Sequence, residues 1–230
     1  MDPLENPVWH TLVGDLSHLA ELDPADPPRA ARFDPAVSVF TALEDDPTDE
    51  SWVALARLVG PGGIAVLFRS EVAEPPGWTT VARMDGLQMS GEAVRADGGS
   101  DGLVRLTSVD VPDMLDLIAR TEPGPFAART IEAGLYLGIR RDGRLVAMAG
   151  QRLRCDGWVE ISAVCTDPDH RGRGLARQLV AAVVSAVREE GAQPFLHVAA
   201  TNGTAQALYR SMGFEAVRPL SAVVLQPPGP

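Results

Sequence analysis

The stretch DHRGRGLARQLVAAVVSAVREEGAQPFLHVAATNGTAQALYRSMGF, residues 169–214, carries the most information in this chain. Its first part, HRGRGLA at residues 170–176, places two glycines and an alanine where a helix begins. The first amide N–H groups of a helix have no intrahelical partner and attract an anion. Its second part, NGTAQALY at residues 202–209, places an amide and a phenol on another helix. Together they predict a site for a diphosphate-bearing ligand with a proton donor nearby.

Other glycine motifs fit this loop less well. No Gly-Lys-Ser/Thr follows it, so it is not the phosphate loop of nucleotide triphosphatases. It is also a poor dinucleotide fingerprint, because Arg177 stands where a third small residue belongs. A glycine turn that merely begins an ordinary helix remains the alternative.

Length and composition predict a soluble protein with a packed core. The chain has 230 residues, of which 45% are hydrophobic, and no apolar run approaches the roughly 18 residues that span a bilayer. Its start, MDPLE, lacks the features of a signal peptide, so we expect a cytoplasmic location. The two cysteines, Cys155 and Cys165, make neither a disulfide framework nor a metal site. We therefore expect no metal.

The net charge of −11 is unevenly distributed. Residues 1–100 hold 17 acidic residues and 6 arginines, whereas residues 101–230 hold 14 of each. Nucleic-acid binding needs a basic surface, so we expect no nucleic-acid partner. An acidic first half is compatible with a cationic substrate, although it also serves solubility.

A Gly- and Asp-rich segment, ADGGSDG at residues 96–102, is the clearest boundary in the chain. It predicts an N-terminal α/β domain over residues 1–100 and a second domain over residues 101–230. In the first domain Ser51–Val59 fits a helix, stopped by Gly60. The other expected elements are short strands, placed at Val37–Leu43 (or a turn), Ile64–Phe68, Trp78–Met84 and Leu87–Ser90.

The second domain shows a sharper pattern. Helices are expected from Ser108 or Asp110 through Ile118, and at about 127–133, 173–190 and 202–212. Strands are expected at 103–106, 135–140, 145–151, 158–164, 195–199, 214–217 and 221–225. Asp142-Gly143 is a strong hairpin signal, and Asp156-Gly157 predicts another tight turn.

Two linked blocks resemble the signature of the GNAT acyltransferase superfamily. RGRGLA at 171–176 matches its (Arg/Gln)-x-x-Gly-x-(Gly/Ala) motif, and NGTAQALY at 202–209, followed by GF at 213–214, matches its second block. The order of elements over residues 103–225 matches as well. The resemblance implies an α/β fold with a mixed, mostly antiparallel central sheet flanked by helices. The first hundred residues loosely resemble the divergent first half of two-part GNAT enzymes and carry no second motif.

The resemblance implies that acetyl-CoA is the cosubstrate. It carries over to twelve cofactor-binding residues: Ala163, Val164, Cys165, Arg171, Gly172, Arg173, Gly174, Leu175, Ala176, Asn202, Ala205 and Tyr209. The strand at 163–165 would pair with the pantetheine arm, the loop amides would hold the pyrophosphate, and Asn202 would bond to pantetheine. Tyr209 would donate a proton to the leaving thiolate, because a phenol with a pKa of about 10 stays protonated at neutral pH. A core aromatic is the alternative for Tyr209.

Glu160 is the expected general base. It lies in the strand before the loop, where some family members place a glutamate that deprotonates the amine, and an idle acid is costly to bury. Alternatively, its side chain faces solvent or pairs with an arginine. His197 is the rival base, with Glu132 and Glu122 ranked lower. Two aromatic residues could line the acceptor site, Phe126 and Trp158.

The resemblance implies an acyltransferase that moves an acetyl group from acetyl-CoA to a primary amine by direct attack in a ternary complex. The alternative is a non-catalytic CoA-binding sensor or scaffold. The sequence specifies neither the acceptor nor the acyl length. The first half would shape the acceptor pocket or support a dimer, so the chain would be a monomer or a homodimer.

Overall fold

The computed structural model describes residues 2–72, 75–95 and 101–229. The helices and strands of the first half are α1 (Pro7–Val13), β1 (Ala20–Leu22), β2 (Ala30–Phe33), β3 (Thr41–Leu43), α2 (Asp49–Val59), β4 (Ala65–Arg69) and β5 (Thr79–Ser90). Those of the second half are β6 (Leu103–Arg105), α3 (Val111–Thr121), β7 (Tyr136–Arg141), β8 (Arg144–Cys155), β9 (Trp158–Thr166), α4 (Leu175–Glu189), β10 (Gln193–Ala199), α5 (Gly203–Met212) and β11 (Glu215–Gln226).

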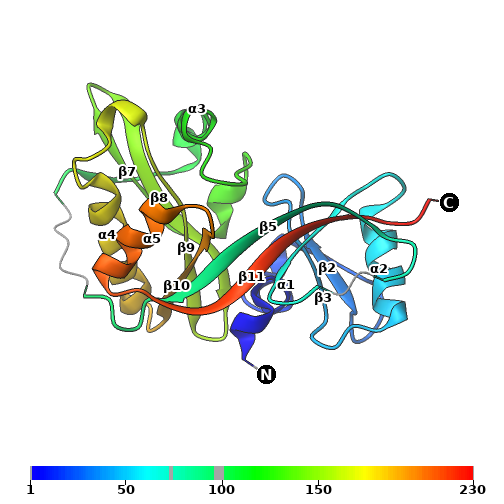
Figure 1. Ribbon diagram of the computed structural model, residues 1–230. Coiled ribbons are helices and arrows are strands. Elements are labelled where there is room, and N and C mark those ends of the chain that lie inside the picture. The colour runs from blue at the N-terminus through cyan, green and yellow to red at the C-terminus, as the bar shows by residue number, and fades with distance from the viewer. Residues whose placement is uncertain (1, 73–74, 96–100, 230) are drawn as a thin grey trace.

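The strands of the described residues form one sheet in the order β1-β2-β3-β4-β11-β5-β10-β9-β8-β7-β6. Two neighbouring pairs, β3 with β4 and β9 with β10, are parallel, and the others are antiparallel. Helices α4 and α5 lie on one side of the β7–β10 part of the sheet, and the first half of the chain lies on the other (Figure 1). The predicted mixed, mostly antiparallel sheet flanked by helices is confirmed.

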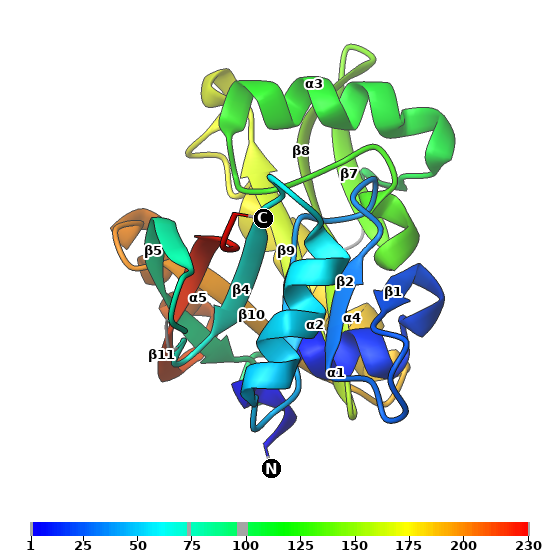
Figure 2. The same cartoon turned by 90° about the vertical axis from the view of Figure 1, so that its right-hand side faces the viewer.

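The first half packs on the same face of the sheet as α3. Figure 2 shows α3 above β7 and β8, with α1 and α2 below it. Residues of α1, such as Val8 and Leu12, share one buried cluster with Leu153 of β8 and Phe195 of β10. Burial of this apolar surface stabilises the contact between the two halves. The first half of the chain thus covers part of the sheet face on which the candidate site lies.

Strand β5 replaces two predicted strands. The sequence predicts Trp78–Met84 and Leu87–Ser90 as separate strands, whereas Thr79–Ser90 is continuous. A Cβ at Gly86 would lie 3.0 Å from the carbonyl oxygen of Val198. Gly86 therefore marks a close approach of β5 and β10 rather than a turn.

Strand β11 likewise spans both of the predicted closing strands, 214–217 and 221–225. Its register against β5 shifts between Ala216 and Arg218, so a bulge absorbs the irregularity within one long strand. Strand β4 pairs only with Ser221–Leu225, so Pro219 lies where one edge of β11 has no strand neighbour. A proline is tolerated at such a position because it has no N–H to donate.

Local signals predicted several other features. Helix α2 ends at Gly60, which has φ of 73°, as expected for a glycine that stops a helix. Asp142-Gly143 and Asp156-Gly157 form the two tight turns with positive φ. The helix expected at 127–133 is only a 3₁₀ turn, Thr130–Ala133. Asp110, one of the two predicted caps, is the N-cap residue of α3 but makes no side-chain capping bond to that helix. It forms a capping box with Thr107 around the preceding 3₁₀ turn, Ser108–Asp110. Helix α1, with a proline in its first turn, was not predicted.

The boundary at 96–102 falls largely outside the described residues. The division into domains 1–100 and 101–230 therefore stays a prediction. Strand β5 belongs to the first hundred residues, yet it lies between β10 and β11 of the second half. In Figure 1, β5 and β11 run side by side from one half of the molecule to the other. Within the described residues, no helix is long and apolar enough to cross a membrane.

Candidate active site

Strands β9 and β10 part near the middle of the sheet. They pair in parallel from Trp158 with Gln193 to Ile161 with Leu196, and no pairing follows, although β9 continues to Thr166 and β10 to Ala199. Main-chain groups of residues 162–166 that face β10 therefore have no strand neighbour. An extended ligand can satisfy such groups as a pseudo-strand.

A bulge in β9 lies directly beyond the parting. Ala163 has φ of 52°, and the register against β8 shifts between Met148 and Gly150. A non-glycine residue in this left-handed region costs on the order of 1 kcal/mol and is common at functional sites. Ala163 and Val164, two of the predicted cofactor-binding residues, are half-buried here.

Cys165 follows the bulge and turns into the core. It is 7% exposed, and burial raises the pKa of its thiol to about 11. The thiolate is the nucleophilic form of cysteine, so the neutral Cys165 is a poor nucleophile at physiological pH. Its main chain, which pairs with Met148 on one side, is the part that faces the opening between the strands.

The loop before α4 is bare and exposed, as the sequence predicts. Gly172 and Gly174 have φ of 74° and 77°, and a Cβ on either would meet no atom within 4 Å. Gly174 occupies the N-cap position of α4 and makes no side-chain capping bond. The first-turn amides, including those of Leu175 and Ala176, have no intrahelical partner. This arrangement suits a diphosphate, which the helix dipole also favours.

Two exposed arginines, Arg171 and Arg173, lie at the rim of this loop. Arg171 Nε donates to the Thr166 carbonyl (3.3 Å), and one Arg173 Nη donates to the Asp169 carbonyl (3.1 Å). The loop is anchored by Asp167, which is buried and forms an ion pair with Arg120 of α3. Sequence analysis missed Arg120, because only the fold brings it to the loop.

The head of α5 supplies Asn202 and Ala205. Asn202 Oδ1 accepts a hydrogen bond from the Ala205 amide (3.0 Å) and so caps the helix. Only the Nδ2 group of Asn202 is left to donate to a ligand. The Ala205 N–H is used in the cap, so Ala205 can contribute only its small side chain.

Tyr209 lies on the buried face of α5. It is 6% exposed, and its ring meets Phe214 edge-on at a centroid distance of 5.7 Å. Burial, with a smaller effect from the neighbouring Cys165, raises the pKa of Tyr209 to about 12. The phenol is therefore protonated at neutral pH, as a proton donor requires, and it is near β9.

Glu160 lies in a buried ion network and is 1% exposed. Arg152 binds it bidentately, with Nε–Oε2 of 2.8 Å and Nη2–Oε1 of 2.6 Å, and His197 Nδ1 lies 2.7 Å from Oε1. Burial opposes ionisation, but Arg152 and His197 outweigh it and lower the pKa of Glu160 to about 2. The structure therefore shows the alternative in which Glu160 pairs with an arginine. A carboxylate with so low a pKa is a weak base by itself.

The proton of His197 can be assigned from its neighbours. Gln88 Nε2 lies 2.8 Å from the Leu4 carbonyl oxygen, which can only accept, so Nε2 is the NH₂ end of the glutamine amide. The same NH₂ group lies within hydrogen-bond distance of His197 Nε2 (3.0 Å). His197 Nε2 must then accept, which places the proton on Nδ1, where it is donated to Glu160. Burial lowers the pKa of His197 below its usual value, so the imidazole is neutral at neutral pH.

The first half of the chain completes this network. Gln88 and Leu4 come from it, and the Arg152 guanidinium lies 4.9 Å from the centroid of the Phe40 ring. Aromatic rings also enclose His197, since Phe68 lies 4.4 Å away between ring centroids. Counting outward from the Asp156-Gly157 turn puts Leu153 opposite Glu160 and Arg152 opposite Ile161. The register shift between Gln151 and Arg154 is what brings Arg152 beside Glu160, and no local signal identifies Gln88.

The other predicted acceptor-side residues are separate from the network. Glu132 is bound to Arg129 (2.8 Å), which also holds Asp34 of the first half, and both acids are at the surface. Glu122 is exposed at the C-cap of α3. Phe126 packs edge-on against Tyr136, and Trp158 against Phe195.

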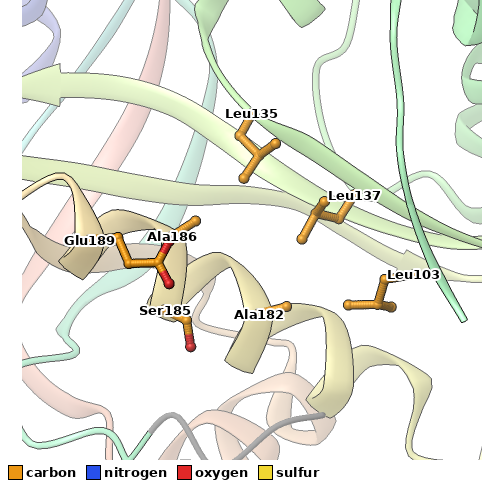
Figure 3. Close-up of a pocket in the computed structure, with 7 residues that line it drawn as sticks. All are labelled: Leu103, Leu135, Leu137, Ala182, Ser185, Ala186 and Glu189. Atoms are coloured by element: carbon orange, nitrogen blue, oxygen red, sulfur yellow. The ribbon is translucent and has the colours of Figure 1, made fainter. Parts of the chain in front are cut away.

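A hollow of about 460 Å³ lies elsewhere, between α4 and the outer strands β6 and β7 (Figure 3). Its lining is mostly aliphatic, and Glu189 is its one charged residue. It contains none of the predicted site residues. Among the described residues, no group of three or more His, Cys, Asp or Glu could hold a metal ion.

Comparison with known proteins identifies the family. A family model described as FR47-like protein matches residues 136–221. The chain is 38% identical to a GNAT-family protein of Novosphingobium aromaticivorans DSM 12444, and the two structures cover 99% of each other with a TM-score of 0.87. This chain belongs to the GNAT family of acetyltransferases.

Two curated relatives match shorter segments. Mycothiol acetyltransferase of Kocuria rhizophila is 46% identical over 57 residues, which cover 24% of this chain and 19% of that protein. N-alpha-acetyltransferase RimI of Mycobacterium tuberculosis is 39% identical over 85 residues, which cover 36% of this chain and 52% of that protein. The chain thus spans about a fifth and about half of these two relatives.

Proposed function

We propose that this protein is an N-acetyltransferase that moves the acetyl group of acetyl-CoA to a primary amine by direct attack in a ternary complex. The observation that carries the proposal is the parting of β9 and β10 beside the bare head of α4. Membership of the GNAT family supports it. The name of the RimI relative suggests α-amines as one acceptor class to test.

The residues around the opening suit acetyl-CoA. The amides at Gly172–Ala176, with Arg171 and Arg173 at the rim, would bind the diphosphate. The main chain of Ala163–Cys165 would pair with the pantetheine arm, and Asn202 Nδ2 would donate to it. Both glycines leave free space where a side chain would otherwise stand.

The reaction needs one proton donor and one proton acceptor, and different residues serve as each. The amine nitrogen forms a bond to the thioester carbonyl carbon while the carbon–sulfur bond breaks. Tyr209 donates its proton to the departing sulfur. The Glu160–His197 pair takes up the proton that the amine loses, because the adjacent carboxylate stabilises the imidazolium that forms. The hydrogen bond between Gln88 Nε2 and His197 Nε2 has to break before His197 Nε2 can accept this proton.

The test combines binding with turnover. Calorimetry with acetyl-CoA is followed by CoA-thiol release with small amines and with peptides that have a free N-terminus. The proposal predicts release that depends on the amine, with initial-rate plots that intersect rather than run parallel. Binding without release across the whole panel would favour the non-catalytic sensor, and absence of binding at millimolar acetyl-CoA would overturn both.

A pH profile separates the two candidate bases. Because only the neutral amine attacks, ionisation of the substrate alone makes kcat/KM for the amine fall steadily as the pH drops. The pKa of His197 lies below the ordinary value of about 6.5, so this decline is expected to become steeper below that value. Protonation of Glu160, whose pKa is about 2, cannot produce a decline in that range. In His197→Gln we expect a lower rate and no such steepening.

His10 offers a matched control for this profile. It is a half-buried histidine that pairs with Asp45 in the first half of the chain (3.2 Å). His10→Gln should leave the profile as in the wild type, provided that both are folded at each pH. A wild-type profile that does not become steeper down to pH 4, or a steepening that survives in His197→Gln, would exclude His197 as the proton acceptor.

The diphosphate site is tested by Gly174→Glu. The new carboxylate would stand where phosphates should bind and would adopt a φ of 77° that disfavours a side chain. We expect acetyl-CoA affinity to fall by about 100-fold or more from charge repulsion and bulk. Gly143→Glu, at a turn with φ of 80°, carries the same backbone strain away from the site and should keep wild-type affinity. Equal affinity of the two variants would remove the assignment.

A further inference from the structure

A row of residues crosses the sheet at the parting of β9 and β10. Tyr136 of β7 pairs with Gly150 of β8, and Gly150 pairs with Ser162 of β9. On the other side of the parting, His197 of β10 pairs with Gln88 of β5. Residues paired across strands project from the same face of a sheet. Ser162 lies two residues after Glu160 in β9, so the two share a face. Tyr136 therefore projects from the sheet face that carries the Glu160–His197 network.

The Tyr136 ring lies across Gly150. A Cβ at Gly150 would stand 2.3 Å from Tyr136 Cδ1 and 2.5 Å from Cε1. No side chain other than hydrogen fits beneath the ring, so Gly150 lets the phenol reach over β8 in the direction of β9. The charges of Arg152 and Glu160 both act on the pKa of Tyr136, which is consistent with this direction.

The hydroxyl of Tyr136 is buried and has no hydrogen-bond partner among the described residues. The residue as a whole is 1% exposed. An unsatisfied buried polar group costs about 1–3 kcal/mol, so phenylalanine would serve the fold better. Such groups in a native structure call for an explanation, and a ligand is one. Gln88 Oε1, on the other side of the parting, is also buried without a partner.

We propose that Tyr136 is a substrate-binding residue whose hydroxyl oxygen accepts an N–H of the acceptor amine. One N–H held in this way leaves the nitrogen lone pair free to attack the thioester. Phe126, which is half-buried and packs against the ring at 5.7 Å, has to move aside for the amine to enter. The inference rests on the proposed acetyltransferase function and adds an acceptor-side contact to it.

Tyr136→Phe tests the proposal, because it removes only the hydroxyl and keeps the ring over Gly150. We expect KM for the amine to rise about tenfold, the size of one lost hydrogen bond. KM for acetyl-CoA and kcat should stay within about twofold, and Tm should be unchanged or higher. Initial rates at saturating acetyl-CoA and a thermal melt measure these quantities.

Thr41→Val is the matched control. Thr41 Oγ1 is another buried hydroxyl without a partner, on β3 in the first half of the chain. Its replacement should also leave Tm unchanged or raise it, but without any change in KM for the amine. A change in KM confined to Tyr136→Phe therefore separates substrate binding from a general effect of removing a buried hydroxyl.

The possible failures are distinguishable. Unaltered amine kinetics in Tyr136→Phe, or a lower Tm with unaltered kinetics, would overturn this inference and leave the proposed function intact. A wild-type protein that binds acetyl-CoA but releases no CoA with any amine would overturn the proposed function, and this inference with it.

Discussion

Replacing Arg152 by methionine is expected to lower the free energy of unfolding by about 3–5 kcal/mol. Arg152 is 11% exposed and binds the buried Glu160 through two hydrogen bonds. Without it, Glu160 keeps only His197 as a partner and remains charged in an apolar surrounding. The penalty arises from that uncompensated charge, because methionine can still fill part of the space beside Phe40.

A second substitution should recover much of this loss. In Arg152→Met/Glu160→Gln the buried charge is gone, and the glutamine oxygen can still accept from His197 Nδ1. Urea titrations of the wild type, both single variants and the double variant give the coupling free energy, which we expect to amount to several kcal/mol. Additive losses would show that the two side chains act independently.

Arg32 provides an exposed control with the same number of hydrogen bonds, although both go to a single carboxylate oxygen, Oε2. It also binds a glutamate, Glu21, through two hydrogen bonds of 2.8 and 2.6 Å, but these side chains are 26% and 47% exposed. Exposed ion pairs contribute about 0–1 kcal/mol, so Arg32→Met should have little effect. Equal losses at Arg32 and Arg152 would contradict the role of burial.

The pH dependence of this effect has a defined sign. The lowered pKa of Glu160, about 2, contributes stability that is complete above the ordinary glutamate value of about 4.3. This contribution is lost as the pH falls toward 2. In Arg152→Met, by contrast, burial without its partner raises the pKa of Glu160, and the variant takes up a proton first. The gap in unfolding free energy between wild type and Arg152→Met should therefore begin to narrow above about pH 4 and keep narrowing as the pH falls toward 2.

Local sequence signals predicted the local structure of the loop before α4 and of α5 well. The glycines at 172 and 174, the cap at Asn202 and the buried position of Tyr209 each depend on residues within a few positions along the chain. Positive φ at a glycine and a capped helix start are properties of short segments. The same holds for the Asp142-Gly143 and Asp156-Gly157 turns.

The Glu160–His197 network could not be predicted in this way. Gln88 reaches His197 because β5 from the first half lies between β10 and β11, a pairing between residues 109 positions apart. Glu160 could be named from the sequence, but whether it is a free base or an ion-pair partner depends on Arg152 and His197 together. The sequence predicts separate strands before and after Gly86, and again before and after Pro219, whereas each residue lies within one continuous strand held by its neighbours.

Replacing Tyr209 by phenylalanine is expected to lower kcat by about 100-fold, the lower end of what a positioned proton donor contributes. Burial raises the pKa of Tyr209 to about 12, so the wild-type phenol holds its proton throughout the neutral and mildly alkaline range. Phenylalanine retains the edge-on contact with Phe214 and cannot donate. Acetyl-CoA affinity and Tm should therefore change little, as calorimetry and a thermal melt would show.

The chain contains only two tyrosines, and their phenylalanine variants should fail in different ways. Loss of the proton donor at Tyr209 acts on the departure of the thiolate, so it lowers kcat and leaves KM for the amine nearly unchanged. Loss of the hydroxyl at Tyr136 acts on the arriving amine, so it raises KM for the amine and leaves kcat nearly unchanged. A kcat in Tyr209→Phe within about threefold of the wild type would return Tyr209 to the role of a core aromatic. If Tyr209→Phe instead lost its affinity for acetyl-CoA, Tyr209 would be a cofactor-binding residue rather than the proton donor.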